Sequence, residues 1–443
     1  MSTAALAARP KIGGAAPALP PVPVLPAWPV LAVLWGYPLF WASGLLMFSM
    51  PIMAVVMVAF LAMRRSIRLV PGILPLVVFA LWMLPSATMV ETTGHLLSLL
   101  IRFSTYGSVA IMMVYIVNAR HALTPRRLLN ALTFVWVFLI LAGYLGVLFP
   151  YGRLTFTIGQ FLPAGLLANE YVYDLAFPVF AEVQTPWGAQ EPFVRPSAPF
   201  AYSNGWGAAF AILTPLAVAN AVSHRSVRAY VLLGIAGVAA IVPAAATTNR
   251  GLFLGLAFGL GYFIVRALLA RWWSAAVIAT GAALLALGAL TASGLFDAIA
   301  NRQSVVDTTT GRFDVYSETF RRTLESPILG YGAPRPGQTT EIFVGTQGAI
   351  WMAMFCFGFV GLALLLVFLG GIVWRTARAP DAATLWAHTC LVVALLLSTY
   401  YGIDRLIVFI GVAAALMLRE RFGGGSTWWH RQPVPFASPD HAD

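Results

Sequence analysis

The sequence predicts an all-α integral membrane protein that crosses the lipid bilayer many times. Of its 443 residues, 60% are hydrophobic and only 10% are charged, and the mean hydropathy is +0.82. A soluble domain carries roughly 25% charged residues, so a chain this poor in charge would not cover a surface exposed to water. Apolar runs of about 20 residues recur along the chain, and a helix of that length spans the hydrocarbon core of a bilayer.

About twelve segments are expected to cross the membrane, judged by their length and apolar character. They are residues 28–43, 45–63, 69–86, 95–118, 128–149, 201–222, 229–246, 251–268, 272–292, 347–374, 383–400 and 405–419. The first two are short and meet at a soft turn near Ser43 and Gly44. The expected membrane domain therefore covers residues 28–419, with tails at 1–27 and 420–443.

The first tail is expected to be flexible and cytoplasmic, and not to be a cleavable signal. Arg9 and Lys11 are followed by the proline-rich run PALPPVPVLP, where a signal peptide has an uninterrupted apolar segment.

The distribution of charge predicts that both ends of the chain lie in the cytoplasm. With the N-terminus inside, 17 of the 27 basic residues but only four of the 16 acidic residues fall on the cytoplasmic side. Every short inside loop then carries at least two basic residues, as the positive-inside rule requires. Membrane topology thus accounts for the net charge of +11, and the expected surroundings are membrane lipids, with no nucleic-acid partner.

Two long loops, residues 150–200 and 293–346, fall on the extracytoplasmic side in this topology. Most other connections are only a few residues long, and loops of about 50 residues in a compact protein are usually functional or disordered. The first loop contains the apolar run FLPAGLLANEYVYDLAF, so it is expected to pack on the membrane surface or fold back as a partial cap.

The second loop is expected to contain an amphipathic helix from about 311 to 325. Apolar residues recur there at helical spacing, at Phe313, Tyr316, Phe320 and Leu324. Thr309 or Thr310 is expected to cap its start, and Ser326-Pro327 to end it.

Three arginines on the extracytoplasmic side are candidates for binding phosphate. Arg195 lies in RPSAPFAYSN, Arg250 in TTNRG, and Arg312 in GRFDVYSETF. Planar guanidinium groups suit bidentate contacts with phosphate, and the expected position of Arg312 in the first turn of a helix also favours anions. Arg250 precedes a helix with glycines every fourth residue, which allows close packing against a neighbour. The alternative is that each arginine only reaches for lipid head groups at the interface.

Other polar residues in the apolar segments have simpler interpretations. Arg102 is expected to reach the interface, to pair with Glu91 or Asp404, or to contact substrate. His388 is expected to be a hydrogen-bonded core residue, and Asp404 to pair locally with Arg405. Cys356 and Cys390 cannot form a disulfide framework, and no cluster has the spacing of a metal site or of a phosphate-binding glycine loop, so no metal or cofactor is expected.

The order of these motifs resembles the O-antigen ligase and O-antigen polymerase superfamily of bacterial envelope proteins. The resemblance rests on RPSAPFAYSNGWGA, TTNRG, GRFDVYSETFRRTLESPILGYG and GTQGAIWMAMFCFGFVGL, and covers about residues 195–365. It implies a metal-independent glycosyltransferase of about twelve helices in the bacterial inner membrane. The donor it implies is a glycan on undecaprenyl diphosphate, transferred to a hydroxyl of a glycan or glycolipid acceptor. Arg250 and Arg312 would bind the diphosphate, and Arg195 would be a weaker third.

The chain departs from this family at one position. The family commonly has a histidine, thought to be the general base, where this sequence has Gln347, and a glutamine does not accept a proton at useful pH. Three alternatives stay open: Asp314 or Glu318 acts as base, positioning of the hydroxyl and departure of the diphosphate suffice, or the chain is inactive. Two further hypotheses are a transporter or flippase of lipid-linked glycans and a non-catalytic assembly partner, although no acidic residue lies deep in a predicted span.

Overall fold

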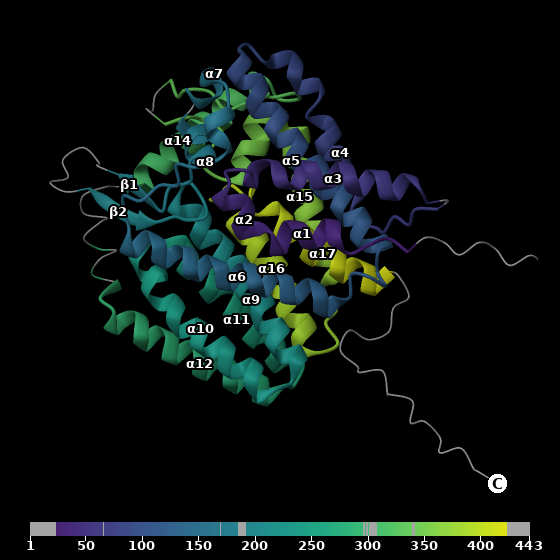
Figure 1. Ribbon diagram of the computed structural model, residues 1–443, viewed down its shortest axis with the longest axis vertical. Coiled ribbons are helices and arrows are strands. Elements are labelled where there is room, and N and C mark those ends of the chain that lie inside the picture. Colours follow the sequence, from purple (N-terminus) through teal and green to yellow (C-terminus); the bar gives the residue numbers. More distant parts are fainter. Residues whose placement is uncertain are drawn as a thin grey trace, which may run out of the picture.

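The computed structural model is a bundle of α-helices with a small β-hairpin at one end (Figure 1). It describes residues 24–64, 66–168, 170–184, 192–295, 297, 300, 308–338 and 342–422. The predicted tails therefore lie almost entirely outside the described residues, as do parts of the second long loop.

Helices dominate both halves of the chain. The first half contains α1 (Trp28–Trp35), α2 (Tyr37–Ala42), α3 (Leu46–Ala62), α4 (Leu74–Trp82), η1 (Pro85–Met89), α5 (Thr93–Asn118), α6 (Pro125–Leu148), η2 (Ile158–Phe161), α7 (Ala164–Leu167), α8 (Glu170–Ala176), β1 (Ala181–Gln184) and β2 (Phe193–Pro196). The second half contains α9 (Ser203–His224), α10 (Val227–Ala246), α11 (Arg250–Leu269), α12 (Trp273–Ala292), α14 (Thr308–Thr323), α15 (Ala349–Thr376), α16 (Ala382–Leu397) and α17 (Ile407–Phe422).

Each predicted span overlaps a helix or, for residues 28–43, the pair α1 and α2. Gly44 lies in the predicted turn with a left-handed φ of 74°. Among the described residues, seven helices are long and apolar enough to cross a membrane, namely α5, α6, α9, α10, α11, α12 and α15. The chain is thus a multi-pass membrane protein. The count of twelve spans stays a prediction, because α4, for example, has nine residues where 18 were expected.

The bundle has a buried centre and an exposed edge. Helices α9 and α17 bury most of their side chains, and Trp206 of α9 stacks on Phe210 while donating to the Leu139 carbonyl of α6 at 2.9 Å. Helices α10 and α12 lie together at the lower edge in Figure 1, and their apolar side chains, such as Ile235 and Val277, are exposed. Such an apolar outer surface suits contact with lipid tails.

The described residues between 150 and 202 pack against the ends of several helices. Strands β1 and β2 pair antiparallel, and Gly146 of α6 lets the hairpin approach so closely that an added Cβ would lie 2.4 Å from the Phe180 carbonyl oxygen. Ile158 donates its N–H to the Ser43 carbonyl at 2.9 Å, which joins the segment to the turn between α2 and α3. We call the end of the bundle formed by residues 150–168, 170–184, 192–202, 308–338, 342–348 and 398–406 the loop end. It lies at the upper left in Figure 1, where α7, α8, α14, β1 and β2 gather.

The amphipathic helix of the second loop is present as α14, but it begins at Thr308. Thr309 and Thr310 therefore lie inside its first turn, and Arg312 lies one residue beyond that turn. The helix thus begins three residues before Gly311, the predicted first residue. The predicted dipole contribution to an anion site at Arg312 is correspondingly weaker.

Helix α15 is broken at Gly358, where φ is 69° and ψ is −175°. The chain after α14 inserts there, since Phe359 donates its N–H to the Pro327 carbonyl at 2.8 Å. On the other side of the break, Tyr331 donates to the Phe355 carbonyl at 3.0 Å and Gly332 to that of Cys356 at 2.8 Å. The backbone of the ESPILGYG motif thus forms hydrogen bonds with the groups that the break leaves without helical partners. These hydrogen bonds attach the end of α14 to α15.

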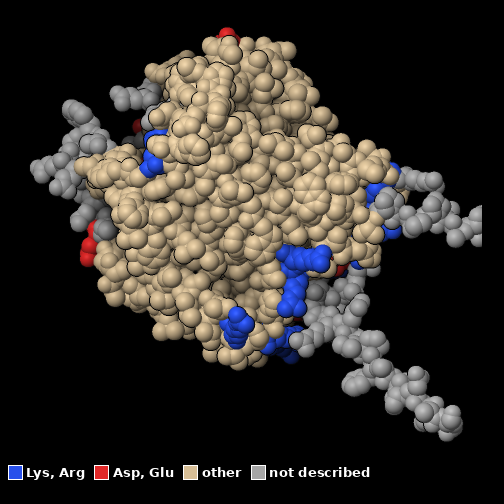
Figure 2. All heavy atoms as spheres, in the orientation of Figure 1, with Lys and Arg blue, Asp and Glu red and all other residues tan. Residues whose placement is uncertain are grey.

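The charges differ between the two ends of the bundle. On the face shown in Figure 2, most arginine and lysine atoms lie toward the right and lower right, whereas acidic atoms are visible at the left and top. The loop end is thus the less basic end of that face. The predicted topology relies on such an excess of basic residues at one end. The orientation of the protein in the membrane stays a prediction.

Candidate anion-binding site at the loop end

Arg250 is the first residue of α11, and a network of hydrogen bonds fixes the backbone around it. Asn249 caps the helix by accepting from the Leu252 N–H at 3.2 Å, and it donates to the Ser203 carbonyl at 3.3 Å. The Tyr401 hydroxyl donates to the same amide oxygen of Asn249. Arg250 itself is exposed, so the network presents its guanidinium group at the surface of the loop end.

Close helix packing brings Tyr401 to this position. A Cβ at Gly251 would lie 2.3 Å from the Tyr401 hydroxyl oxygen, and one at Gly259 would lie 2.6 Å from a methyl group of Val393. Between them, a Cβ at Gly255 would lie 3.2 Å from a methyl group of Leu397. The glycine face that the sequence predicted therefore packs against α16 and the hairpin that follows it.

Arg312 approaches Tyr401 from α14. Its Cζ atom lies 5.9 Å from the centre of the Tyr401 ring. Burial raises the pKa of Tyr316, one turn along α14, and the charge and hydrogen bond of Arg312 partly offset this rise. Among the residues that the structure describes, no carboxylate forms a salt bridge with Arg312. Aromatic side chains therefore hold the guanidinium group of Arg312 in place.

Gln347 lies beside this pair, just before α15. The Tyr316 hydroxyl donates to the Gln347 backbone carbonyl at 3.2 Å. The Tyr316 ring stacks on Trp351 at 4.3 Å, and the Trp351 indole donates to the Thr399 carbonyl at 2.9 Å. Gln347 is thus in direct contact with the helix that carries Arg312.

Arg195 also lies near Tyr401, but unlike Arg312 it forms a salt bridge with a described carboxylate. It is 4% exposed, lies opposite Glu182 in the β-hairpin, and forms a 2.9 Å salt bridge with that carboxylate. Glu182 also accepts from the Ser203 N–H at 2.8 Å, which ties the hairpin to the start of α9. Its Nη2 donates to Glu182 and, at 3.2 Å, to the side-chain oxygen of Gln184, so this nitrogen is used within the protein.

The charges of all three arginines act on Tyr401. Burial raises the pKa of Tyr401, and Arg312, a backbone hydrogen bond from Gly251, Arg195 and Arg250 lower it in that order. Burial and Tyr401 together raise the pKa of Tyr400 to about 12 against the opposing charge of Arg312. The predicted arginines are thus brought together around one hairpin. We call Arg195, Arg250 and Arg312 the arginine cluster.

Several buried polar atoms near the arginine cluster lack a hydrogen-bond partner among the described residues. They are Arg195 Nε, Ser197 Oγ, Ser203 Oγ, Thr248 Oγ1 and Tyr400 Oη. Thr248 also has a left-handed φ of 46°, a conformation that a β-branched residue rarely adopts. Unsatisfied polar atoms and local strain concentrate at functional sites, so this region is suited to a polar ligand.

The two candidate carboxylates are not on the side of α14 that faces the cluster. Glu318 is 3% exposed, lies 3.6 Å from Arg322, and accepts from the Gln338 N–H at 2.6 Å. Asp314 is exposed and lies two positions from both Arg312 and Tyr316, and residues two apart do not share a helix face.

A second polar group lies beside the cluster along α5. Arg102 forms a 3.2 Å salt bridge with Asp404, which also accepts from the Tyr106 hydroxyl at 2.8 Å. This is one of the alternatives predicted for Arg102, and the predicted local pair of Asp404 with Arg405 stays a prediction. Further out, Arg335 pairs with Glu91 and lies 2.7 Å from His95 Nδ1.

The sequence predicted no role in a site for Asn249, Tyr316, Tyr401 or Trp351; Tyr316 was expected only on the apolar face of the loop helix, and Trp351 only in lipid-facing or core packing. The available signal was weak: Asn249 stands in TTNRG, and Tyr401 in a short polar hairpin between two apolar spans. Within the described residues, no group of three or more histidine, cysteine or acidic side chains could hold a metal ion.

These features define the class: a multi-pass membrane protein with a basic and aromatic site at one end of its helix bundle. Residues 235–352 match the family model described as O-antigen ligase, which confirms the predicted resemblance over that part of the chain. Arg250, Arg312 and Gln347 fall inside the match, whereas Arg195 precedes it. No curated protein matches the chain.

Proposed function

We propose that the protein transfers a glycan from a polyprenyl diphosphate carrier to an acceptor hydroxyl outside the cytoplasmic membrane. The observation that carries this proposal is the convergence of Arg250 and Arg312 at Tyr401, within the segment that matches the O-antigen ligase family. In this proposal the two guanidinium groups bind the diphosphate. Undecaprenyl diphosphate is the proposed carrier, and the loop end faces the periplasmic side of a bacterial inner membrane.

The bond changes follow from the chemistry of the donor. The acceptor oxygen attacks the anomeric carbon, and the bond from that carbon to the diphosphate oxygen breaks with its electron pair going to the diphosphate. Fixed cations stabilise this leaving group more strongly as its charge develops. Because Gln347 accepts no proton and neither Asp314 nor Glu318 shares the Arg312 face of α14, we assign the hydroxyl proton to the departing diphosphate.

Arg195 has a supporting role in this proposal. Its salt bridge with Glu182 and the bond from Ser203 hold the hairpin and the start of α9 beside Asn249. It adds positive charge near Tyr401 without offering its full set of donors.

The break in α15 is the observation that favours a transporter, since broken helices line many transport sites. Here the break is filled by backbone groups of residues 327–332 and by the Trp82 indole, which donates to the Phe357 carbonyl at 3.0 Å. A filled break leaves no polar passage at that point, so glycan transfer is the better-supported function.

The test is turnover of a lipid-linked glycan by the purified protein. Wild-type protein is expected to release undecaprenyl diphosphate only when an acceptor is present, and Arg250→Ala to abolish most of this release. Arg228→Gln is the matched control, because Arg228 is also exposed but lies at the other end of the bundle, at the start of α10.

A deletion strain separates the alternatives. Transfer predicts that glycan repeat units on the carrier accumulate outside the membrane, whereas a flippase predicts accumulation on the cytoplasmic face. A non-catalytic partner would release no diphosphate in the purified assay, and that result would contradict the proposal.

A further inference from the structure

A second candidate site lies at the opposite end of α11 from Arg250. Twenty residues of helix correspond to about 30 Å, which is the thickness of the hydrocarbon core. A pocket of about 250 Å³ opens there between the end of α11, the start of α12 and the connection from α15 to α16. Its lining residues are Arg266, Leu269, Ala270, Trp272, Ala379 and Leu385.

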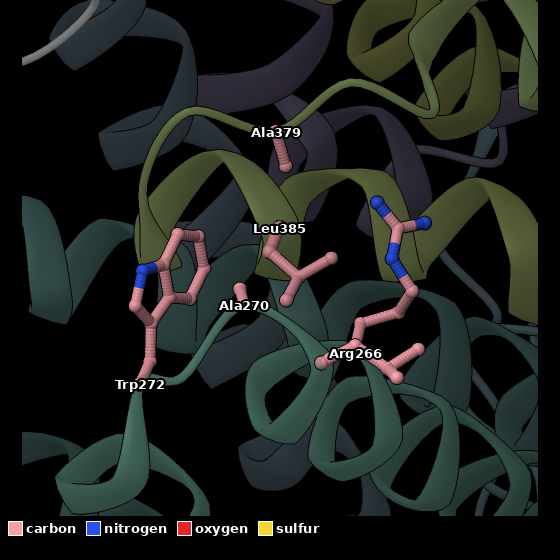
Figure 3. Close-up of a pocket in the computed structure, with 6 residues that line it drawn as sticks. Arg266, Ala270, Trp272, Ala379 and Leu385 are labelled. Atoms are coloured by element: carbon pink, nitrogen blue, oxygen red, sulfur yellow. The ribbon is translucent and has the colours of Figure 1, made fainter.

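The pocket is amphiphilic. In Figure 3, Arg266 and Trp272 stand on its two sides, with Ala270 and Leu385 between them and Ala379 above. Beside it, Phe263 and Trp386 stack at 3.9 Å and form a rigid apolar support. One cation beside an otherwise apolar lining suits a ligand with an anionic group attached to hydrocarbon.

Arg266 is fixed in place with donors to spare. Its Nη1 donates to the Tyr262 hydroxyl at 2.5 Å and its Nη2 to the Ala377 carbonyl at 2.7 Å. Tyr262 is held in turn by His388 at 2.8 Å, and His388 by Thr376 at 3.0 Å. A guanidinium group has five N–H donors, so donors remain for a phosphate after these two bonds.

The surroundings provide both charge and hydrocarbon contact. Arg271 and Arg378 are next to the lining residues Ala270, Trp272 and Ala379 in the chain. The carboxylate of Asp381 is occupied in capping α16, accepting from the Thr384 N–H at 2.8 Å. On the outside, Leu269 and Trp273 are 77% and 62% exposed. A head group bound at Arg266 would therefore have its acyl chains beside the apolar outer surface of α11 and α12.

We propose that this pocket binds the head group of an anionic phospholipid in the cytoplasmic leaflet. Basic pockets between membrane-spanning helices on that side recognise such head groups. The volume equals about eight water molecules, which is room for a phosphoglycerol group. The bound lipid would join the end of α11 to the α15–α16 connection. This inference does not depend on the proposed glycan transfer.

Native mass spectrometry of the full chain in detergent tests the proposal with phosphatidylglycerol and phosphatidylcholine as probes. Wild-type protein is expected to retain one phosphatidylglycerol at least fivefold more tightly than phosphatidylcholine. Arg266→Gln removes the cation, and Ala379→Trp fills the pocket while leaving the cation in place. Both are expected to weaken phosphatidylglycerol binding about five- to tenfold, and Arg228→Gln, at the same end but away from the pocket, is expected to leave it unchanged.

Two results would overturn the site. One is equal retention of the two lipids by the wild-type protein. The other is undiminished phosphatidylglycerol binding in Ala379→Trp, a variant that keeps every hydrogen bond of Arg266 and so remains informative if Arg266→Gln does not fold.

Discussion

Arg312 and Arg322 lie on the same helix, α14, but their surroundings differ. Arg322 is 8% exposed, lies 3.6 Å from Glu318, donates to the Pro336 carbonyl at 2.9 Å and stands over the ring of Phe355. Arg312 is half-buried beside Tyr316 and Tyr401, and no described carboxylate forms a salt bridge with it. Arg322 is thus neutralised and hydrogen-bonded within the fold. The positive charge of Arg312 instead lies where a ligand can neutralise it.

The difference shows how to sort arginines at the loop end. Arg195 resembles Arg322, because a buried carboxylate neutralises it. Arg102 and Arg335 also have carboxylate partners. Arg312 stands apart, since among the described residues its close neighbours are aromatic, and a phosphate is the natural counter-charge for it.

The largest expected effect is on activity, from Arg312→Ala. Turnover of the lipid-linked glycan should fall about 100- to 1,000-fold, the range seen when one donor to a developing anion is removed. The melting temperature of the purified protein should stay close to that of the wild type, because Arg312 pairs with no described carboxylate. A variant that keeps full turnover would show that Arg312 does not contact the leaving group.

Arg322→Ala should produce the opposite pattern. Removing one partner of a buried ion pair leaves Glu318 with an uncompensated charge and should cost about 3 kcal/mol of stability. Thermal unfolding in detergent measures this loss. Turnover per folded molecule should stay within a few-fold of wild type, and a large loss there with unchanged stability would erase the distinction between the two arginines.

Gly251→Ala tests whether close packing holds Tyr401 in the arginine cluster. The new Cβ would lie 2.3 Å from the Tyr401 hydroxyl oxygen, so the ring must shift. We expect a loss of activity of about tenfold, since small displacements of positioning groups cost that much or more. Gly261→Ala is the matched control on the same helix, because nothing lies within 4 Å of its added Cβ. Equal activities of the two variants would contradict this role of Gly251.

The smallest expected effect is that of Asp314→Asn. Asp314 lies two positions from Arg312 and so points away from the cluster, and activity should change less than about threefold. A pH–rate profile separates the alternatives. Loss of an ionisation together with a fall of 100-fold or more would identify Asp314 as the general base.

The sequence predicted the helices well because apolar length and small-residue spacing are local signals. The predicted spans overlap helices, and the glycines of α11 pack as expected. It also selected three arginines that the fold brings to one tyrosine. The sequence did not predict that these arginines would have different salt-bridge and hydrogen-bond partners. Glu182 reaches Arg195 only through a β-hairpin, and Tyr401 reaches Arg250 only through helix packing. The break at Gly358 likewise depends on a loop that inserts from elsewhere in the chain.

Binding of undecaprenyl diphosphate tests the central claim most directly, because it needs no acceptor and no knowledge of the sugars. The dissociation constant would be measured for wild-type protein, Arg312→Ala and Arg322→Ala, with undecaprenyl monophosphate as the reference lipid. We expect Arg312→Ala to lose about tenfold or more in affinity for the diphosphate, and Arg322→Ala to bind like wild type once folded. Equal affinities of the wild type and Arg312→Ala for the diphosphate would contradict the assignment of this site.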